Sequence, residues 1–367
     1  MRALIFAICF AFIVVGCSAD LASYVEPPKI EDGIETSTLT SAGFDSLKVL
    51  ELSKKINDGT FPGVHGVLIS RKGKLLYEEY FQGYDANTPH LFYSAGKIIT
   101  STIFGLAYDR GLLNPEDRLI KFYEPYYPSI QNSDKRKESI KFKNLLTMST
   151  GIECGILGDN KTDINRKMIK SFRPVKLFLD QPMRTSPGES FDYTDANIQV
   201  IATAVATVIG NDYDQFEKNA FLEPLQISAE NYHKGYLPRD FLKIGIMYQN
   251  NGMWNGRQIL SRDWIEKATT FKIKPTVPED IADGYGYYWW LKKFDYRGRK
   301  VDCYFAAGNG HQYLYVVPEL ELVVVFTGGN FESDFLHSQP HRMLQEYIIN
   351  AMILKDSAAT KILADIQ

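Results

Sequence analysis

The sequence predicts an α+β fold: an antiparallel sheet made from both ends of the chain, flanked by helices, with a mainly helical subdomain inserted between its halves. Two observations support this class. Apolar, β-favouring runs occur near the start, within residues 64–81, and again near the end, within residues 285–327. The long stretch between them has the patterns of helices and loops, and no internal repeat is visible.

Each predicted element depends on a local pattern. A helical period runs from Phe44 to Ile56, and two apolar runs around Arg71-Lys72-Gly73 predict a hairpin. Four more strands and a helix are expected near the end of the chain. The predicted strands are Val64–Ser70, Lys74–Phe81, Tyr285–Leu291, Val301–Ala306, Gln312–Val317 and Leu322–Thr327, and the last helix covers Arg342–Leu354.

Composition excludes two classes of protein. The chain has 367 residues, 45% of them hydrophobic and 23% charged, with a net charge of −3. Disorder is excluded, because a disordered chain needs few apolar residues and a large net charge. We expect no nucleic-acid partner, because no basic stripe stands out. The length allows one large domain or two ordinary ones.

The N-terminus has the pattern of a secretory signal. After Arg2, residues 3–16 are all apolar or glycine, a run too short to span a bilayer. The run ends before Cys17 in a sequence that resembles the lipobox of bacterial lipoproteins, which implies cleavage and a lipid on Cys17. With Ser18 following, this implies anchoring in the cell envelope, at the outer membrane if the cell is Gram-negative. The alternative is an ordinary signal with a chance cysteine.

These patterns divide the chain into three parts. We expect a signal peptide, then a polar tether, then one folded domain whose helical part interrupts its α/β part. The predicted boundaries are 1–16 for the signal, 17–45 for the tether and 46–360 for the domain, with its α/β part at about 46–93 and 270–360 and its helical part at about 94–269. Cys154 and Cys303 remain in the domain, and we expect two separate buried thiols rather than one bridge.

The chemistry begins at Ser94-Ala95-Gly96-Lys97. Residues 98–107 are apolar on nearly all faces, so they predict a buried helix with Ser94 at its N-terminus. Lys97 then lies one turn further on the same side, where its amine reaches the Ser94 hydroxyl. Burial should lower the pKa of Lys97 and make it a base. The alternative is a capping serine followed by an ordinary lysine with its amine in solvent.

Two further segments have the features of a site. Tyr193 lies just before an apolar helix that Asp195 or Asn197 would cap, and a phenol there can relay protons. The alternative is a packed loop tyrosine. Residues 306–312 are rich in small side chains before a strand, so a substrate can approach the strand backbone and bind its amides.

Taken together, these motifs resemble the serine β-lactamase-related hydrolases, which include class C β-lactamases, DD-peptidases, carboxylesterases and 6-aminohexanoate-dimer hydrolases. Ser94-x-x-Lys97 resembles the nucleophile motif of that family. The resemblance extends in order over about residues 60–352. Its other segments are 143–151, 187–197, 239–245 followed by 251–260, and 308–318. It implies a β-lactamase/transpeptidase-like fold.

The resemblance also implies roles for single residues. Ser94 would be the nucleophile, with Lys97 and Tyr193 as general base and acid and no metal or cofactor. The Ser94 amide and an amide near Gly310 would bind the oxyanion. The substrate-binding residues would include Asp195, Asn309 and His311, although His311 is equally compatible with a surface or supporting role.

Two departures from the family pattern bear on function. The family's Tyr-x-Asn is Tyr193-Thr194-Asp195 here, and a carboxylate at this place would pair with Lys97 and hold it protonated. No Lys-Thr-Gly or His-Thr-Gly exists, and Gly308-Asn309-Gly310 takes its place. Because that cation helps β-lactam enzymes bind the antibiotic's carboxylate, its absence favours an esterase or amidase.

Other functions stay open. A β-lactamase or DD-peptidase is one alternative, and a non-catalytic envelope protein that binds peptidoglycan stems or a partner is another. A Ser-His-Asp hydrolase is a third, although Phe92-Tyr93-Ser94-Ala95-Gly96 meets only half of its motif. The expected partners are a small or peptide-like substrate and the membrane through the lipid, and no pattern specifies the oligomeric state.

Overall fold

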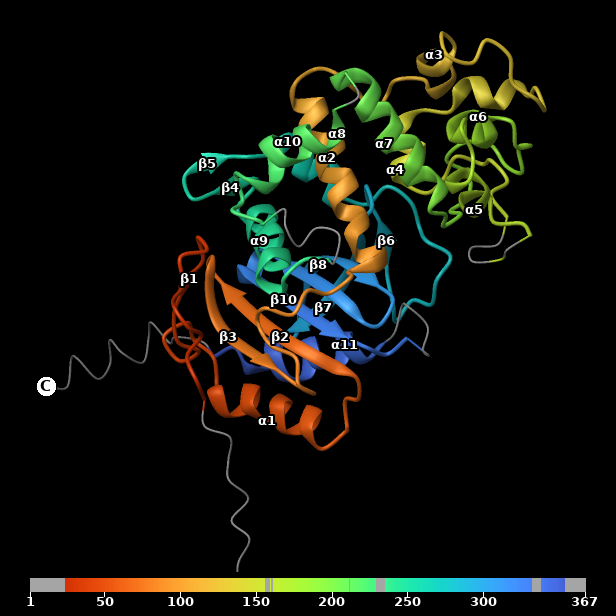
Figure 1. Cartoon of the computed structure of the whole chain (residues 1–367). Coiled ribbons are helices and arrows are strands. Elements are labelled where there is room, and N and C mark those ends of the chain that lie inside the picture. Colours follow the sequence, from red (N-terminus) through yellow and green to blue (C-terminus); the bar gives the residue numbers. More distant parts are fainter. Residues whose placement is uncertain are drawn as a thin grey trace, which may run out of the picture.

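The computed structural model describes residues 24–155, 159, 161–210, 212–228, 235–331 and 338–353. Its centre is an eight-stranded sheet in the order β1-β3-β2-β10-β9-β8-β7-β6 (Figure 1). All neighbouring strands pair antiparallel except β1 and β3. The strands are β1 (Glu35–Thr36), β2 (Val64–Arg71), β3 (Lys74–Tyr80), β6 (Gly284–Tyr285), β7 (Trp290–Tyr296), β8 (Arg299–Gly308), β9 (Gln312–Val317) and β10 (Leu322–Gly328).

The two ends of the chain meet at the centre of this sheet. β10 pairs with β2 on one side, where Val324 lies opposite Ile69, and with β9 on the other, where Val324 lies opposite Tyr315. These central strands are apolar on both faces, which predicts cover on both faces of the sheet. The predicted α+β class, with a sheet built from both chain ends, is confirmed.

Helices cover both faces. α1 (Ser46–Asn57) and α11 (Ser338–Met343), which continues through η6 (Leu344–Ile348), lie on one face, and α9 (Pro238–Gln249) lies on the other (Figure 1). The inserted region extends from that second face. Its helices are α2 (Lys97–Asp109), α3 (Leu119–Tyr123), α4 (Phe142–Leu146), α5 (Ile164–Ile169), α6 (Pro174–Leu179), α7 (Ala196–Ile209), α8 (Tyr213–Glu217) and α10 (Arg262–Thr269).

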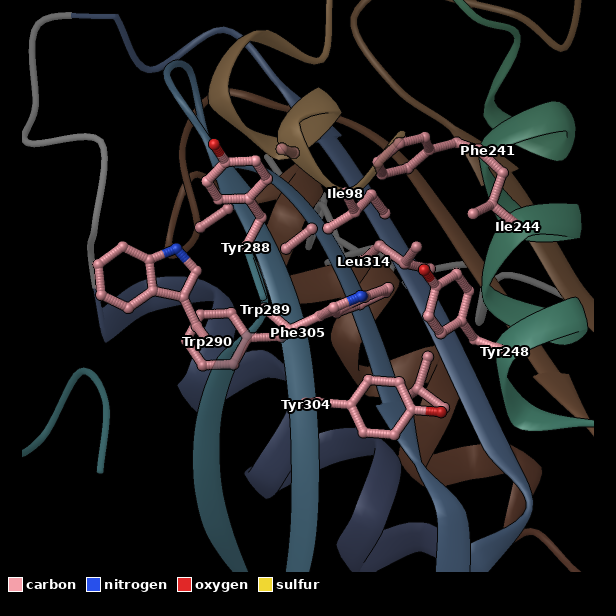
Figure 2. Close-up of a cluster of buried hydrophobic side chains, with 14 of the residues drawn as sticks. Ile98, Phe241, Ile244, Tyr248, Tyr288, Trp289, Trp290, Tyr304, Phe305 and Leu314 are labelled. Atoms are coloured by element: carbon pink, nitrogen blue, oxygen red, sulfur yellow. The ribbon is translucent and has the colours of Figure 1, made fainter. Parts of the chain in front are cut away.

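An aromatic core joins the inserted helices to the sheet (Figure 2). Trp289 packs on Tyr248 of α9 with ring centroids 4.7 Å apart, and Phe241 of α9 stacks on Phe92 at 3.8 Å. α9 was expected within the helical part, yet it packs directly on β9 and β10. Phe92 precedes the turn that holds Ser94, so this stack ties the candidate nucleophile to the central sheet.

The predicted strand Tyr285–Leu291 is wrong in its middle. β6 ends at Tyr285 and β7 begins at Trp290, and the Gly286 amide donates to Trp289 O at 2.8 Å across a tight turn. Tyr288 has a φ of +66°, which a strand residue does not adopt. An unbroken apolar run concealed the turn, because turns are usually marked by glycine or asparagine at the residue with positive φ.

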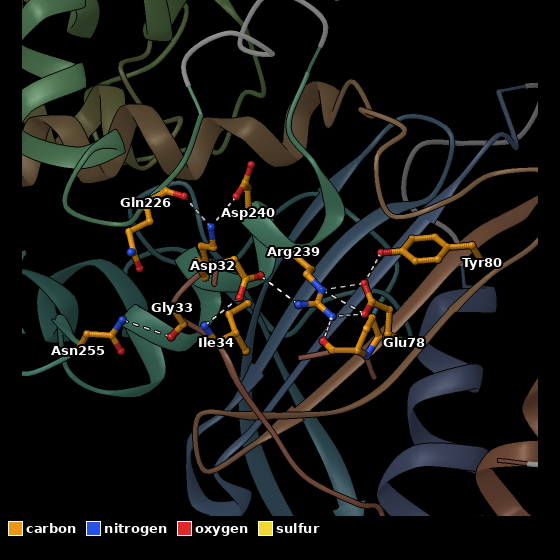
Figure 3. Close-up of polar contacts among 11 residues, drawn as sticks. Asp32, Gly33, Ile34, Glu78, Tyr80, Gln226, Arg239, Asp240 and Asn255 are labelled. Atoms are coloured by element: carbon orange, nitrogen blue, oxygen red, sulfur yellow. Dashed lines mark hydrogen bonds and ion pairs between the residues drawn. The ribbon is translucent and has the colours of Figure 1, made fainter. Parts of the chain in front are cut away.

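The prediction of a tether at residues 17–45 is wrong for residues 24–45, the part of it that the structure describes. The Tyr24 hydroxyl donates to Leu76 O at 2.7 Å, and β1 joins the sheet edge. Arg239 of α9 donates to Asp32 at 3.1 Å and to Glu78 of β3 at 2.9 Å (Figure 3). Residues 24–45 are therefore part of the folded domain, held by these polar contacts and by the buried side chains of Ile34, Leu39 and Phe44.

The predicted signal peptide and Cys17 lie outside the described residues. Within the described ranges, no helix has the length and apolar character needed to cross a bilayer. Cys154 and Cys303 are both buried and free, so the expectation of two separate thiols is confirmed.

Candidate active site

Ser94 and Lys97 are brought together by one turn of backbone. Ser94 lies in a 3₁₀ turn, η1 (Tyr93–Gly96), and Lys97 is the first residue of the buried helix α2. The Lys97 ammonium donates to Ser94 Oγ at 2.8 Å. The spacing of three residues therefore places the amine at the hydroxyl, as the sequence predicted.

Asp195 completes the environment of Lys97. Lys97 Nζ lies 2.6 Å from Asp195 Oδ1, and only 5% of the Lys97 side chain is exposed, against 36% for Asp195. Burial lowers the pKa of Lys97, but the nearby Tyr193 and Asp195 raise it by more, so the net shift is upward. The expectation of a lowered pKa is thus corrected. The expectation that Asp195 pairs with Lys97 agrees with this geometry.

Tyr193 lies in the loop that leads into α7, next to Lys97. Lys97 Nζ is 4.7 Å from the centre of its ring. Trp290 of β7 also packs on this ring, with centroids 5.9 Å apart and planes 24° from parallel. Phe191 packs on Trp290 and Tyr285 in turn. An aromatic cluster from the β6–β7 hairpin therefore fixes the ring of the candidate proton relay.

The end of β8 packs directly against η1, the turn that holds Ser94. A Cβ atom at Gly308 would lie 2.1 Å from Phe92 O and 2.9 Å from the Ala95 amide nitrogen. A side chain there would collide with the backbone on both sides of Ser94. Gly308 is therefore required for the close approach of β8 to η1.

The three residues after Gly308 do not line the cavity at Ser94. The Gly310 amide donates to Asn309 Oδ1 at 2.9 Å. His311 is 4% exposed, and its Nδ1 lies 3.0 Å from Asn330 Nδ2, which donates to it. This loop is thus held by its own polar contacts, and the substrate-binding roles of Asn309, Gly310 and His311 stay predictions.

Ser94 opens into a cavity of about 500 Å³. Ser94, Lys97 and Asp195 form one wall, and Tyr213, Glu217 and Tyr236 belong to the side formed by α8 and the segment before α9. Sequence reasoning missed these last three residues. No sequence pattern singles them out, because Tyr213 and Glu217 lie in the mostly polar stretch 212–219, where such side chains are too common to point to a site.

The aromatic run 285–290 forms the end of β6, a tight turn and the start of β7. Its five aromatic side chains, Tyr285, Tyr287, Tyr288, Trp289 and Trp290, are all buried. The Tyr288 hydroxyl has no hydrogen-bond partner among the described residues. The contribution of the run to the site is indirect, because Trp290 backs the Tyr193 ring. Among the described residues, no group of three or more His, Cys, Asp or Glu side chains is arranged to hold a metal ion.

This sheet with inserted helices, and a Ser-x-x-Lys turn at their junction, defines the β-lactamase class of folds. The family model described as Beta-lactamase matches residues 51–233. The chain belongs to the serine β-lactamase-related family, as its ordered motifs predicted.

Two relatives show how far the sequence similarity extends. PbpX of Bacillus subtilis (strain 168), provisionally named a penicillin-binding protein, is 26% identical over 216 residues, 55% of this chain and 50% of PbpX. Protein flp of Staphylococcus aureus (strain COL) is 23% identical over 186 residues, 48% of this chain and 36% of that protein. The chain thus spans half or less of the length of these relatives.

Solved structures extend the similarity in fold to most of the chain. A family VIII carboxylesterase matches with a TM-score of 0.63 and 15% identity, covering 86% of this chain and 98% of that one. A class C β-lactamase from Rhodobacter sphaeroides matches with a TM-score of 0.60 and 13% identity, covering 81% and 98%. At such identities the likeness concerns the fold, which is shared by enzymes with different substrates.

Proposed function

We propose that this chain hydrolyses ester or amide bonds through an acyl-enzyme on Ser94, with Lys97 and Tyr193 moving the protons. The observation that carries the proposal is the position of Lys97 Nζ, which lies 2.8 Å from Ser94 Oγ and 2.6 Å from Asp195 Oδ1. A serine hydroxyl is a weak nucleophile and needs an adjacent base. Lys97 is the buried amine within reach of it.

In the proposed reaction, Lys97 acts in its neutral form. Asp195 and Tyr193 keep most of it as ammonium at rest, so the amine is a minor, reactive species. It takes the Ser94 proton as Oγ attacks the carbonyl carbon. The proton then passes through the Tyr193 hydroxyl to the leaving oxygen or nitrogen. Water repeats the sequence on the acyl-enzyme, which releases the acid and restores Ser94.

The developing oxyanion needs amide donors. The Ser94 amide, in the turn that begins α2, is the first. The Gly310 amide is the second that we propose, and it becomes available only when it exchanges its bond to Asn309 Oδ1 for one to the substrate. Loss of such a donor costs about a hundredfold or more in rate.

The charges at the cavity favour esters and amides without a carboxylate. Of the described residues that line it, Lys97 is the only cationic one, and it is paired with Asp195. A β-lactam or a peptide terminus would bring a carboxylate into a cavity whose lining already includes Asp195 and Glu217. We therefore favour esterase or amidase activity over β-lactamase or DD-peptidase activity.

The test is covalent labelling with a fluorophosphonate, followed by hydrolysis assays. Wild-type protein should be labelled on Ser94, Ser94→Ala should not, and Ser139→Ala, which changes an exposed serine, should behave as wild type. p-Nitrophenyl butyrate should be cleaved faster than nitrocefin. Absence of labelling would favour a non-catalytic binding protein, and fast nitrocefin turnover without esterase activity would reverse the proposed substrate preference.

We also propose that Cys17 carries a lipid that anchors the protein in the bacterial cell envelope. The apolar run 3–16 and the lipobox-like end of that run support it. Cys17→Ser should move the protein from the membrane fraction to the soluble fraction. Wild-type protein that is soluble after lysis would contradict the proposal.

A further inference from the structure

Two aromatic side chains stand partly in solvent beside Ser94. Tyr93 lines the cavity and is 49% exposed, and Phe331 is 51% exposed. Their ring centroids are 5.7 Å apart and their planes meet at 67°. Leu91, also at the cavity, is similarly exposed. Large apolar side chains gathered in solvent at a cavity are informative, whereas single scattered ones are ordinary.

The backbone of Tyr93 is strained. Its φ of +46° lies in the left-handed region, which a bulky residue seldom adopts. The strain falls on the residue directly before the candidate nucleophile, and the conformation leaves the ring half in solvent instead of in the core. Such strain persists where the surrounding structure imposes it, and it clusters at active sites and ligand-binding clamps.

Phe331 is held from behind by the loop after β8. A Cβ atom at Gly310 would lie 2.5 Å from Phe331 Cε1, so the ring packs against bare backbone. The preceding residue, Asn330, donates from Nδ2 to Pro62 O at 2.7 Å and to His311 Nδ1 at 3.0 Å. The Asn330 amide donates to Gly310 O at 3.3 Å. Phe331 is thus held beside Tyr93 before any ligand arrives.

We propose that Tyr93 and Phe331 form an aromatic clamp that binds a phenyl-sized apolar group of the substrate next to Ser94. Two rings at a steep angle offer a substrate ring both a face and an edge. The substrate ring can therefore bind in the offset-stacked or edge-to-face arrangement that aromatic pairs prefer. Their fixed positions reduce the ordering cost of binding. His311, through its bond to Asn330, then serves the substrate indirectly as a positioning residue for Phe331, and the Gly310 backbone supports the same ring in addition to the oxyanion role proposed for its amide. This inference rests on the proposed ester or amide hydrolysis at Ser94.

Three esters of similar reactivity test the clamp: butyl butyrate, benzyl butyrate and butyl phenylacetate. The last two carry the ring on the alcohol side and on the acyl side, so they show which part of the substrate the clamp holds. Phe331→Ala should lower kcat/KM about three- to tenfold for one of the aromatic esters, mainly through KM, and leave butyl butyrate unchanged.

Matched variants separate the clamp from general damage. Tyr93→Phe and Phe331→Tyr each keep an aromatic ring and should keep the preference. Phe172→Ala removes an exposed aromatic between α5 and α6, which has no contact with Tyr93 among the ring contacts of the described residues, and should have no effect. Equal losses on all three esters in Phe331→Ala would overturn the proposal.

A binding measurement keeps the clamp testable if turnover fails. Calorimetry on Ser94→Ala should show tighter binding of phenylacetamide than of butyramide, and adding Phe331→Ala should remove the difference. Wild-type protein that hydrolyses no ester, while Ser94→Ala shows this preference, would contradict the proposed reaction but support the clamp. Equal binding of the two amides would overturn the clamp itself.

Discussion

Gly308→Ala tests whether the end of β8 sets the position of Ser94. The new Cβ atom would lie 2.1 Å from Phe92 O, where real Cβ atoms essentially never come closer than 3.0 Å. The colliding atoms belong to backbone, so no side-chain rotation relieves the contact. Phe92 O also accepts a hydrogen bond from the Ala95 amide at 2.9 Å, within the turn that holds Ser94. The turn and the strand must therefore separate by about 1 Å.

The size of the effect follows from that displacement. A 1 Å misplacement of a reacting group costs about a hundredfold in rate, so kcat/KM should fall by about that factor. Overpacking a well-packed region costs about 1–3 kcal/mol of stability, which leaves a domain of this size folded at room temperature. The loss of activity should therefore far exceed any loss of folded protein.

Hydrolysis of p-nitrophenyl butyrate and the rate of fluorophosphonate labelling measure the effect, with thermal unfolding measured alongside. Gly245→Ala is the matched control. Its Cβ atom would meet side chains, Val323 Cγ1 at 2.5 Å and Leu314 Cδ1 at 2.6 Å, away from Ser94. It should lower the melting temperature and leave activity within about threefold, since surrounding side chains can repack. Full activity in folded Gly308→Ala would refute the reasoning.

Three further predictions concern charge and proton transfer. Ser94→Ala and Lys97→Ala should each abolish ester hydrolysis, and the double variant should be little worse, because residues that act as a unit are not additive; an active Lys97→Ala variant would exclude Lys97 as the base. Asp195→Asn removes a charge that raises the pKa of Lys97, so the neutral amine forms at lower pH and the acidic limb of the pH–rate profile should shift to lower pH. An unchanged acidic limb would show that Asp195 does not set the pKa of Lys97. Arg239→Met leaves the buried Glu78 carboxylate without its guanidinium partner, so the free energy of unfolding measured in urea should fall by about 3–5 kcal/mol. Adding Glu78→Leu should recover much of this loss. An Arg239→Met variant as stable as wild type would contradict the prediction.

Local patterns account for what could be predicted. β9 was predicted with its observed ends, Gln312–Val317, because an apolar run of β-favouring residues ended by proline is a strong signal. The contact between Ser94 and Lys97 was predictable because one helical turn separates residues three apart. The meeting of the chain ends in one sheet followed from the order of strands and helices along the chain.

Contacts between distant segments account for what was missed. The docking of residues 24–45 depends on partners such as Arg239, which is more than 200 positions from Asp32. The turn at Tyr288 is held by a bond from its amide to Leu146 O at 3.0 Å. Phe331 showed no signal at all, because nothing local indicates that an exposed ring will lie beside Tyr93. The role of Gly308 was predicted as room for substrate, and in the fold it is room for the backbone of η1.

Local periodicity and short motifs were enough to predict the class of fold and to select candidate residues for the chemistry. The protonation of Lys97, the proposed base, depends on tertiary contacts. Burial by itself would lower the pKa of Lys97, as the sequence suggested, but folding brings Tyr193 and Asp195 against the amine and reverses the shift. The reason is that electrostatic energy depends on distance in space, and 98 positions separate Lys97 from the carboxylate that lies 2.6 Å from it.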